Sequence, residues 1–149
     1  MMEPFHNSFL DVAGKETRCI IIPPGKKLPE GEYYLTESYC NDGNCDCRRV
    51  FINIMHNQKI VATIGYGWEE LPFYEKWSGD KNLTVEMKGP ILELGGQQTE
   101  HSSELLKLFK VIVLDDEMYI ERLKRHYDTF KSSKKRKNWK KWALSLRIW

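Results

Sequence analysis

The sequence lacks any apolar run that approaches the roughly 20 residues a helix needs to span a bilayer. Residues 1–6 also lack the basic region and the following apolar stretch that mark a secretory signal. These two absences disfavour a membrane-spanning protein and an exported one. We therefore expect a cytoplasmic protein with no membrane span.

Common catalytic and nucleotide-binding signatures are absent as well. The sequence contains no Gly-x-Ser-x-Gly elbow, no phosphate loop, no His-Glu-x-x-His pair, no EF-hand and no dinucleotide fingerprint. Its four histidines are scattered, and no serine or cysteine has an evident base partner in the sequence. The enzyme question stays open, and the sequence favours binding over catalysis.

The composition is that of one ordinary globular domain, with 149 residues of which 41% are hydrophobic and 30% charged. The net charge of +2 is unevenly divided along the chain. Residues 1–120 hold 12 Lys/Arg and 19 Asp/Glu, a net −7, whereas residues 121–149 hold 11 and 2, a net +9. A basic tail on an acidic body either folds back onto the body or binds an anionic partner.

Residue alternation with a period of two predicts strands over residues 18–22, 32–39, 49–55, 60–68 and 83–87. The third and fourth of these form a hairpin through residues 56–59, because Asn57 accepts a positive φ at modest cost. Residues 69–77 predict a helical turn. The segment 91–94 lies between two glycine-containing loops.

From residue 102 onward the apolar period becomes 3.6 and predicts two helices, the second running from Asp115 or Asp116 to about residue 131. Their inward stripes are Leu105, Leu108, Phe109 and Ile112 for the first, and Ile120, Leu123, Tyr127 and Phe130 for the second. Strands followed by helices predict an α+β fold, a mainly antiparallel sheet with a C-terminal helical hairpin packed on one face. We expect a loose segment over residues 1–17, one domain over 18–131 with a Cys-rich loop, and a basic Trp-containing tail over 132–149.

Three cysteines crowd into eight residues of a polar loop between two predicted strands: Cys40, Cys45 and Cys47. Cys45 and Cys47 project the same way in an extended stretch, and a turn at Gly43 folds Cys40 back towards them. Thiolates in such a cluster are typical ligands of Zn²⁺, which would fix a loop that is otherwise floppy. We expect a zinc site, with iron in place of zinc, a disulfide, a redox role or inert buried thiols as the alternatives.

The sequence offers no local fourth ligand. Cys19 on the first strand or His126 on the second predicted helix would complete a tetrahedral site. Arg48 and Arg49 follow the loop directly, and we expect their charges to favour thiolates and support the metal from outside its ligand set.

Five stretches carry a resemblance to a known family: Pro23-Pro24-Gly25, Leu28-Pro29-Glu30-Gly31-Glu32-Tyr33, Tyr39-Cys40 through Cys45-Asp46-Cys47-Arg48-Arg49-Val50, Ala62-Thr63-Ile64-Gly65-Tyr66-Gly67 and Arg122-Leu123-Lys124-Arg125-His126-Tyr127. Together they resemble an uncharacterised prokaryotic family with a Tyr-Cys-x4-Cys-Asp-Cys-Arg-Arg-Val motif. The resemblance implies a compact domain over residues 18–131 and a role for the three cysteines, and it implies no reaction. Some members of that family carry a C-terminal SEC-C zinc motif, whereas this sequence has no cysteine after its second predicted helix.

The basic tail has aromatic residues at helical spacing, so it predicts an amphipathic helix that binds a partner. An unknown protein, nucleic acid or an anionic lipid surface would each suit it, because Lys/Arg neutralise phosphates and Trp stacks on bases. The alternative is a solvated or disordered end. The residues expected to contact a partner are Lys134, Lys135, Arg136, Lys137, Trp139, Lys140, Lys141 and Trp142.

These features favour a zinc-stabilised binding module for a protein or nucleic-acid partner. The first alternative is a metal-dependent hydrolase whose zinc keeps an open position, with Asp42 or Asp46 as base. The second is a thiol redox sensor that binds no metal.

Overall fold

The computed structural model describes residues 1–147, and the side chains of residues 1–135 and of Leu144. Six strands form one sheet in which every pairing is antiparallel. The order is β1-β3-β4-β5-β6, and β2 pairs with β3 beside β1. The strands are β1 (Met2–Pro4), β2 (Arg18–Ile22), β3 (Gly31–Cys40), β4 (Arg49–His56), β5 (Lys59–Gly67) and β6 (Ile91–Leu92).

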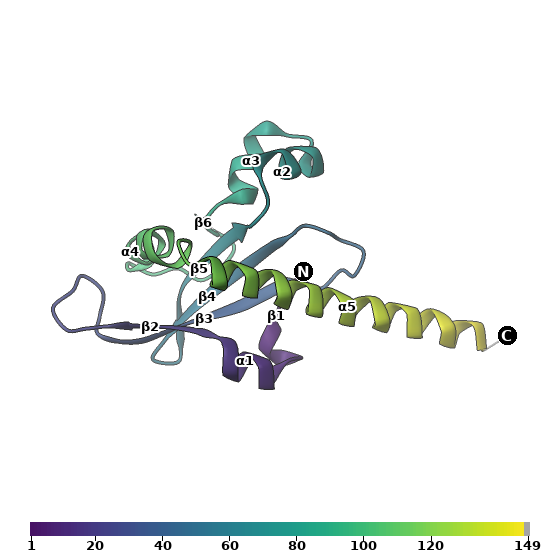
Figure 1. The fold of residues 1–149 in the computed structure, drawn as a ribbon, viewed down its shortest axis with the longest axis horizontal. Coiled ribbons are helices and arrows are strands. Elements are labelled where there is room, and N and C mark those ends of the chain that lie inside the picture. Colours follow the sequence, from purple (N-terminus) through teal and green to yellow (C-terminus); the bar gives the residue numbers. More distant parts are fainter. Residues whose placement is uncertain (148–149) are drawn as a thin grey trace.

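Seven helical segments accompany the sheet, and the fold is α+β, as the sequence predicts. Helix α5 crosses the sheet and projects well beyond it (Figure 1). The helices are the 3-10 turn η1 (Phe5–Asn7), α1 (Leu10–Glu16), α2 (Leu71–Ser78), α3 (Lys81–Lys88), α4 (Ser102–Leu108), the π-helical turn η2 (Phe109–Val113) and α5 (Glu117–Arg147). No helix within residues 1–147 is both long and apolar enough to cross a membrane.

The meander of β3, β4 and β5 forms the centre of the sheet, where the predicted alternation is confirmed. Val50, Ile52 and Ile54 on β4 are buried, while the residues between them are half-buried. The β4–β5 hairpin closes through Asn57 and Gln58, which both adopt a positive φ. This conformation matches the twist of two paired strands, so the hairpin is built locally.

Residues 1–17 are ordered, which corrects the expectation of a loose segment. Strand β1 pairs with the end of β3, where Met2 lies opposite Cys40. The Phe5 side chain is buried, and its ring stacks on His126 of α5 at 4.5 Å. Isolated apolar residues leave no periodic signal in the sequence, and long-range contacts hold this segment.

Residues 83–87 lie in helix α3, so the prediction of a strand there is wrong. Asp80 caps the helix, because its Oδ1 accepts a hydrogen bond from the Asn82 N–H at 2.8 Å. Leu83 and Val85, whose alternation suggested a strand, are exposed, and Thr84 between them is buried. The cap at the start of the segment, and not the alternation inside it, decides the structure. The helical turn expected over residues 69–77 is confirmed by α2.

Helices α4, η2 and α5 cover the sheet face that carries Leu35 and Ile54. Leu105 and Phe109 are buried as predicted, but the stripe then moves from Ile112, which is 51% exposed, to Val113. The reason is the π turn, in which the Leu114 N–H donates to the Phe109 carbonyl five positions back. Such a turn holds one residue more than an α turn and shifts the inward face by one position.

Helix α5 begins where the sequence predicts, because Asp116 Oδ1 accepts hydrogen bonds from the Met118 and Tyr119 N–H groups. Its predicted inward residues Leu123, Tyr127 and Phe130 are buried, while Ile120 is only half-buried. The helix does not end near residue 131. It continues to Arg147, so the expected tail is a backbone extension of this helix.

Candidate metal centre

The cysteine loop, residues 41–48, connects β3 to β4, with Cys40 as the last residue of β3 and Cys47 two residues before β4. Asp42 turns the chain, because its carboxylate accepts a hydrogen bond from the Asn44 N–H and its carbonyl accepts one from the Cys45 N–H. This turn returns Cys45 towards Cys40, as the sequence predicts for a chain that folds back around Gly43.

The sulfur atoms of Cys40, Cys45 and Cys47 all lie within 4.8 Å of one another. A tetrahedral metal with bonds of about 2.3 Å holds its sulfurs roughly 3.8 Å apart, so a small inward movement would bring all three into contact with one ion. The three residues are therefore close enough to hold a metal ion. Within the part of the chain that the structure describes, no further cysteine, histidine or carboxylate joins this group.

The pKa values of two of the three thiols, Cys45 and Cys40, shift in opposite directions. Burial, together with the neighbouring Cys47 and Cys40 sulfurs, raises the pKa of the Cys45 thiol to about 12. Burial acts the same way on Cys40, but a hydrogen bond from the Asp42 backbone and the charge of Lys131 outweigh it and lower its pKa. Ionisation of Cys40 is thus favoured over that of Cys45, and a divalent cation would supply the charge that a Cys45 thiolate needs.

Neither of the expected fourth ligands is placed to reach the cluster. Cys19 lies exposed on β2 opposite Tyr34, six positions and about 20 Å along β3 from Cys40. His126 is buried with both ring nitrogens engaged, Nδ1 with Glu37 Oε1 and Nε2 with Glu16 Oε2, each at 2.7 Å. These placements correct the expectation, and the protein brings three donors to the site.

Arg48 and Arg49 also differ from their expected role, because carboxylates hold their guanidinium groups. Arg48 pairs with Asp46 at 2.9 Å and with Glu69 at 3.6 Å, and Arg49 pairs with Glu93 at 3.0 Å. The cations that act on Cys40 are instead the Met1 ammonium group and Lys131, whose ammonium group donates to the Asp42 carbonyl at 2.8 Å.

Two tyrosines that the sequence does not single out for this role clamp the end of the loop. Arg48 has a φ of 49°, a conformation that non-glycine residues rarely adopt. The Tyr127 hydroxyl accepts a hydrogen bond from the Arg48 N–H at 3.2 Å and donates one to Asp46 at 3.1 Å. The Tyr74 hydroxyl donates to the Arg48 carbonyl at 2.8 Å. Apolar periodicity predicts that Tyr127 points inward but carries no signal for what its hydroxyl binds.

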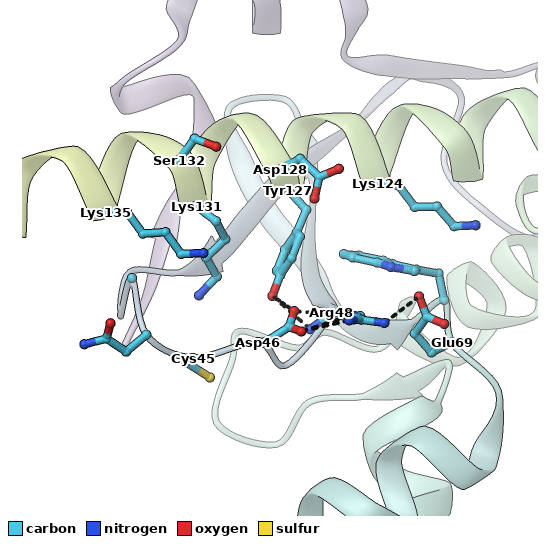
Figure 2. Close-up of a pocket in the computed structure, with 13 residues that line it drawn as sticks. Cys45, Asp46, Arg48, Glu69, Lys124, Tyr127, Asp128, Lys131, Ser132 and Lys135 are labelled. Carbon is cyan, nitrogen blue, oxygen red and sulfur yellow. Dashed lines mark hydrogen bonds and ion pairs between the residues drawn. The ribbon is translucent and has the colours of Figure 1, made fainter.

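A cavity of about 650 Å³ lies between the cysteine loop and α5. Cys45 and Asp46 line it from the loop, and the α5 side chains form the opposite wall (Figure 2). Lys124, Lys131 and Lys135 lie on that wall at steps of seven and four residues, so one face of the helix carries them. The half-buried Trp68 adds an aromatic surface.

Among the residues of the expected partner-binding tail, Lys134 pairs with Glu3 at 2.9 Å and Lys135 lines the cavity. The side chains of the remaining members lie outside the described residues: Arg136, Lys137, Trp139, Lys140, Lys141 and Trp142.

Comparison of this chain with family models, with curated proteins and with solved structures finds no match. The functional interpretation therefore depends on the chemistry of the site itself.

Proposed function

We propose that this protein is a zinc-stabilised binding module whose partner is single-stranded nucleic acid. The observation that carries the proposal is the position of the cysteine loop. It forms one wall of a cavity whose other wall is the lysine-bearing face of α5, and its Cys45 and Cys47 lie beside Cys40. A metal in the loop would fix the shape of that cavity.

Zinc is the ion that suits this donor set best. Cysteine thiolates bind Zn²⁺ in tetrahedral sites, and the ion would hold a polar loop that has little apolar packing of its own. When bound, the ion supplies charge to the thiolates and rigidity to the loop. Cys40, Cys45 and Cys47 would hold it, and Lys131 would partly offset the negative charge of three thiolates.

The nucleic-acid assignment follows from the cavity and from the chain beyond it. Four cationic side chains line the cavity against three carboxylates, and the sequence of α5 adds further lysines and arginines up to Arg147. The cations are Arg48, Lys124, Lys131 and Lys135, and the carboxylates are Asp46, Glu69 and Asp128. Lysines neutralise phosphates, and an indole such as Trp68 offers a stacking surface to an unpaired base. A protein partner is the other outcome that the binding experiment distinguishes.

The first experiment measures metal per chain and free thiols in the purified protein, in Cys45→Ser and in the matched control Cys19→Ser. We expect one zinc per chain in the native protein and in Cys19→Ser, because Cys19 lies far from the cluster. We expect the zinc to be lost in Cys45→Ser together with thermal stability. Absence of metal, with a thiol count that falls by two on mild oxidation, would support a redox sensor instead.

The second experiment follows the fluorescence anisotropy of a labelled twelve-residue oligo(dT) as the zinc-loaded protein is added. Lys135→Glu should weaken binding several-fold and make its dependence on salt less steep, because a phosphate contact is lost. Lys76→Glu is the matched control, since Lys76 is exposed on α2 away from the cavity. Equal binding by both variants, or no binding at all, would remove nucleic acid as the partner.

A metal-dependent hydrolase is the second candidate, because three donors leave a fourth coordination position for water. Asp46 is poorly suited to act as its base. The side-chain hydrogen bond from Arg48 lowers the pKa of Asp46, and Tyr127 also donates to this carboxylate. Zinc-dependent hydrolysis of a phosphodiester such as bis(p-nitrophenyl) phosphate, lost in Cys45→Ser and retained in Cys19→Ser, would favour the hydrolase.

A further inference from the structure

Strand β2 lies at an edge of the sheet. It pairs with the start of β3, whereas the cysteine loop follows the end of β3. This strand pairs with β3 along its full length, from Arg18 opposite Leu35 to Ile22 opposite Gly31. Among the strands that the structure describes, none pairs with the other edge of β2. A free edge presents unpaired N–H and C=O groups to any further strand.

An apolar groove of about 520 Å³ runs between this edge and the helical segment α4–η2. Ile20, Ile21 and Ile22 form its strand side, and Leu108, Val111 and Ile112 form its helix side. Val111 is 73% exposed and Ile112 is 51% exposed. The π turn explains the exposure of Ile112, because it rotates Val113 into the core in place of Ile112. Val111 lies outside the predicted inward stripe, and both side chains line the groove.

The helical segment therefore extends over a place where the sheet has no strand. A strand added to β2 would complete its backbone hydrogen bonds and bring alternate side chains under Val111 and Ile112. We propose that this groove binds an extended, acidic segment of another protein by adding it to the sheet as a further strand next to β2. The site lies apart from the cysteine loop and does not depend on the proposed metal or on nucleic acid.

The net positive charge around the groove favours an acidic segment as its partner. Lys26, Lys27 and Lys107 line it, against one acidic residue, Glu104, which lies 3.1 Å from Lys107 and 3.9 Å from Lys27. An extended segment with apolar residues at alternate positions and acidic residues at its ends would fill the groove and meet the remaining positive charge.

A second copy of this chain suits the groove less well. Antiparallel pairing of two β2 strands about Ile20 would place the Arg18 end of one copy towards the Lys26 and Lys27 end of the other. Arg18 already pairs with Asp116, so a second copy would bring no unpaired acidic group to the lysines of the groove. Pro23 and Pro24 end the strand, so the ladder offered to a partner is about five residues long.

The test uses a fluorescein-labelled peptide, Asp-Ile-Thr-Val-Thr-Val-Asp, and the same peptide with lysine in place of both aspartates. We expect the acidic peptide to bind at least ten-fold more tightly than the basic one, and to slow hydrogen exchange at amides of β2. Val111→Glu should weaken binding of the acidic peptide at least ten-fold, because it places a negative charge in the groove. Leu94→Glu is the matched control, since Leu94 is 93% exposed outside the groove.

The variant Val111→Glu should fold normally because its side chain is largely exposed, and circular dichroism checks this. Zinc chelation should leave peptide binding unchanged, which separates this proposal from the metal-stabilised module. Absence of peptide binding, equal binding of the two peptides, or equal binding by Val111→Glu and Leu94→Glu would overturn the proposal. A dimer in sedimentation experiments that Val111→Glu dissociates would overturn it too, by identifying a second copy as the occupant.

Discussion

Helix α5 holds two segments of the chain through neighbouring residues that use different chemistry. His126 fixes the N-terminal segment, because its ring lies between the carboxylates of Glu37 and Glu16 and stacks on Phe5. Tyr127 fixes the cysteine loop through hydrogen bonds of its hydroxyl to the Arg48 backbone and the Asp46 carboxylate. One attachment is ionic and buried, and the other is made by a neutral hydroxyl group beside a cluster of thiols.

The difference predicts that the two segments respond to different conditions. A buried ionic contact depends on protonation, since a charge left without its partner in the core is costly. A hydroxyl clamp beside three thiols changes little with protons near neutral pH and depends instead on whether a metal fixes the loop. The two attachments should therefore be separable by mutation, although they are adjacent on one helix.

The largest effect is expected for Glu37→Gln, which removes the buried negative charge beside His126. Breaking a buried ion pair by removing one partner costs about 3 to 5 kcal/mol. We expect the free energy of unfolding to fall by about this amount and hydrogen exchange to accelerate over residues 5–16. Metal binding at the cysteine loop should remain unchanged.

Glu121→Gln is the control for this variant, because Glu121 forms an exposed pair with Lys124. Its cost should stay below about 1 kcal/mol. Loss of metal binding in Glu37→Gln would show that the two attachments form one cooperative unit. It would contradict the prediction that they can be separated by mutation.

A smaller effect is expected for Tyr127→Phe, which keeps the ring in the core and removes two hydrogen bonds. The cost should be about 1 to 2 kcal/mol, since a net hydrogen bond contributes roughly 1 kcal/mol. Affinity for zinc, measured by competition with a chromophoric chelator, should fall because the Arg48 N–H and the Asp46 carboxylate lose their hydrogen bonds to α5. Exchange over residues 5–16 should not change.

Tyr34→Phe is the matched control, because the Tyr34 hydroxyl binds the Glu32 carboxylate at an exposed position far from the loop. We expect this variant to retain the native affinity for zinc. A Tyr127→Phe protein with native zinc affinity would show that the thiols alone determine the loop geometry.

The sequence predicts the parts of the molecule that depend on local patterns. The central strands and the inward faces of the helices follow from apolar periodicity, and the cysteine cluster follows from spacing and turn chemistry. Those features depend on neighbours along the chain. Regular alternation in β4, for example, predicts its buried face because the sheet period is two.

The contacts of the N-terminal segment with α5 join residues more than 100 positions apart, such as Glu16 and Phe5 with His126, and no local pattern encodes them. The strand pattern around Glu37 predicts only which face of the sheet it occupies, and the helix pattern around His126 predicts only which face of the helix it occupies. Neither pattern predicts that the two side chains bind each other. The prediction of His126 as a fourth ligand was wrong for the same reason. The helix pattern places His126 near the strands, but no local pattern shows that Glu37 and Glu16 bind its ring nitrogens. The prediction of a strand over residues 83–87 was wrong for a different reason. Those residues alternate as in a strand, but Asp80 caps a helix that includes them.

The smallest expected effect is a change in stability with pH, because titration alters a charge and leaves the side chain in place. Burial lowers the pKa of His126, but the hydrogen bonds and charges of Glu37 and Glu16 outweigh burial and raise it above the usual 6.5. A raised histidine pKa contributes stability that is fully present below 6.5 and is lost as the pH rises through the folded-state value. The side-chain hydrogen bond from Arg125, aided by His126, lowers the pKa of Glu16 from 4.5 to about 2.

These two shifts predict a maximum of stability between about pH 4.5 and 6.5, with the Glu16 contribution lost as the pH falls from 4.5 towards 2. Tyr39, Tyr119 and Arg125 also face this network and keep their charge states over the window, and Arg122 donates to the Glu16 carbonyl. Denaturant unfolding of the zinc-loaded protein at pH 5.5 and 8.5 measures the alkaline side. His126→Gln should abolish most of the difference between the two values, and the control His101→Gln should retain it. A pH dependence that survives in His126→Gln would show that proton sensitivity lies with the thiols of the loop, and would reverse the comparison between the two attachments.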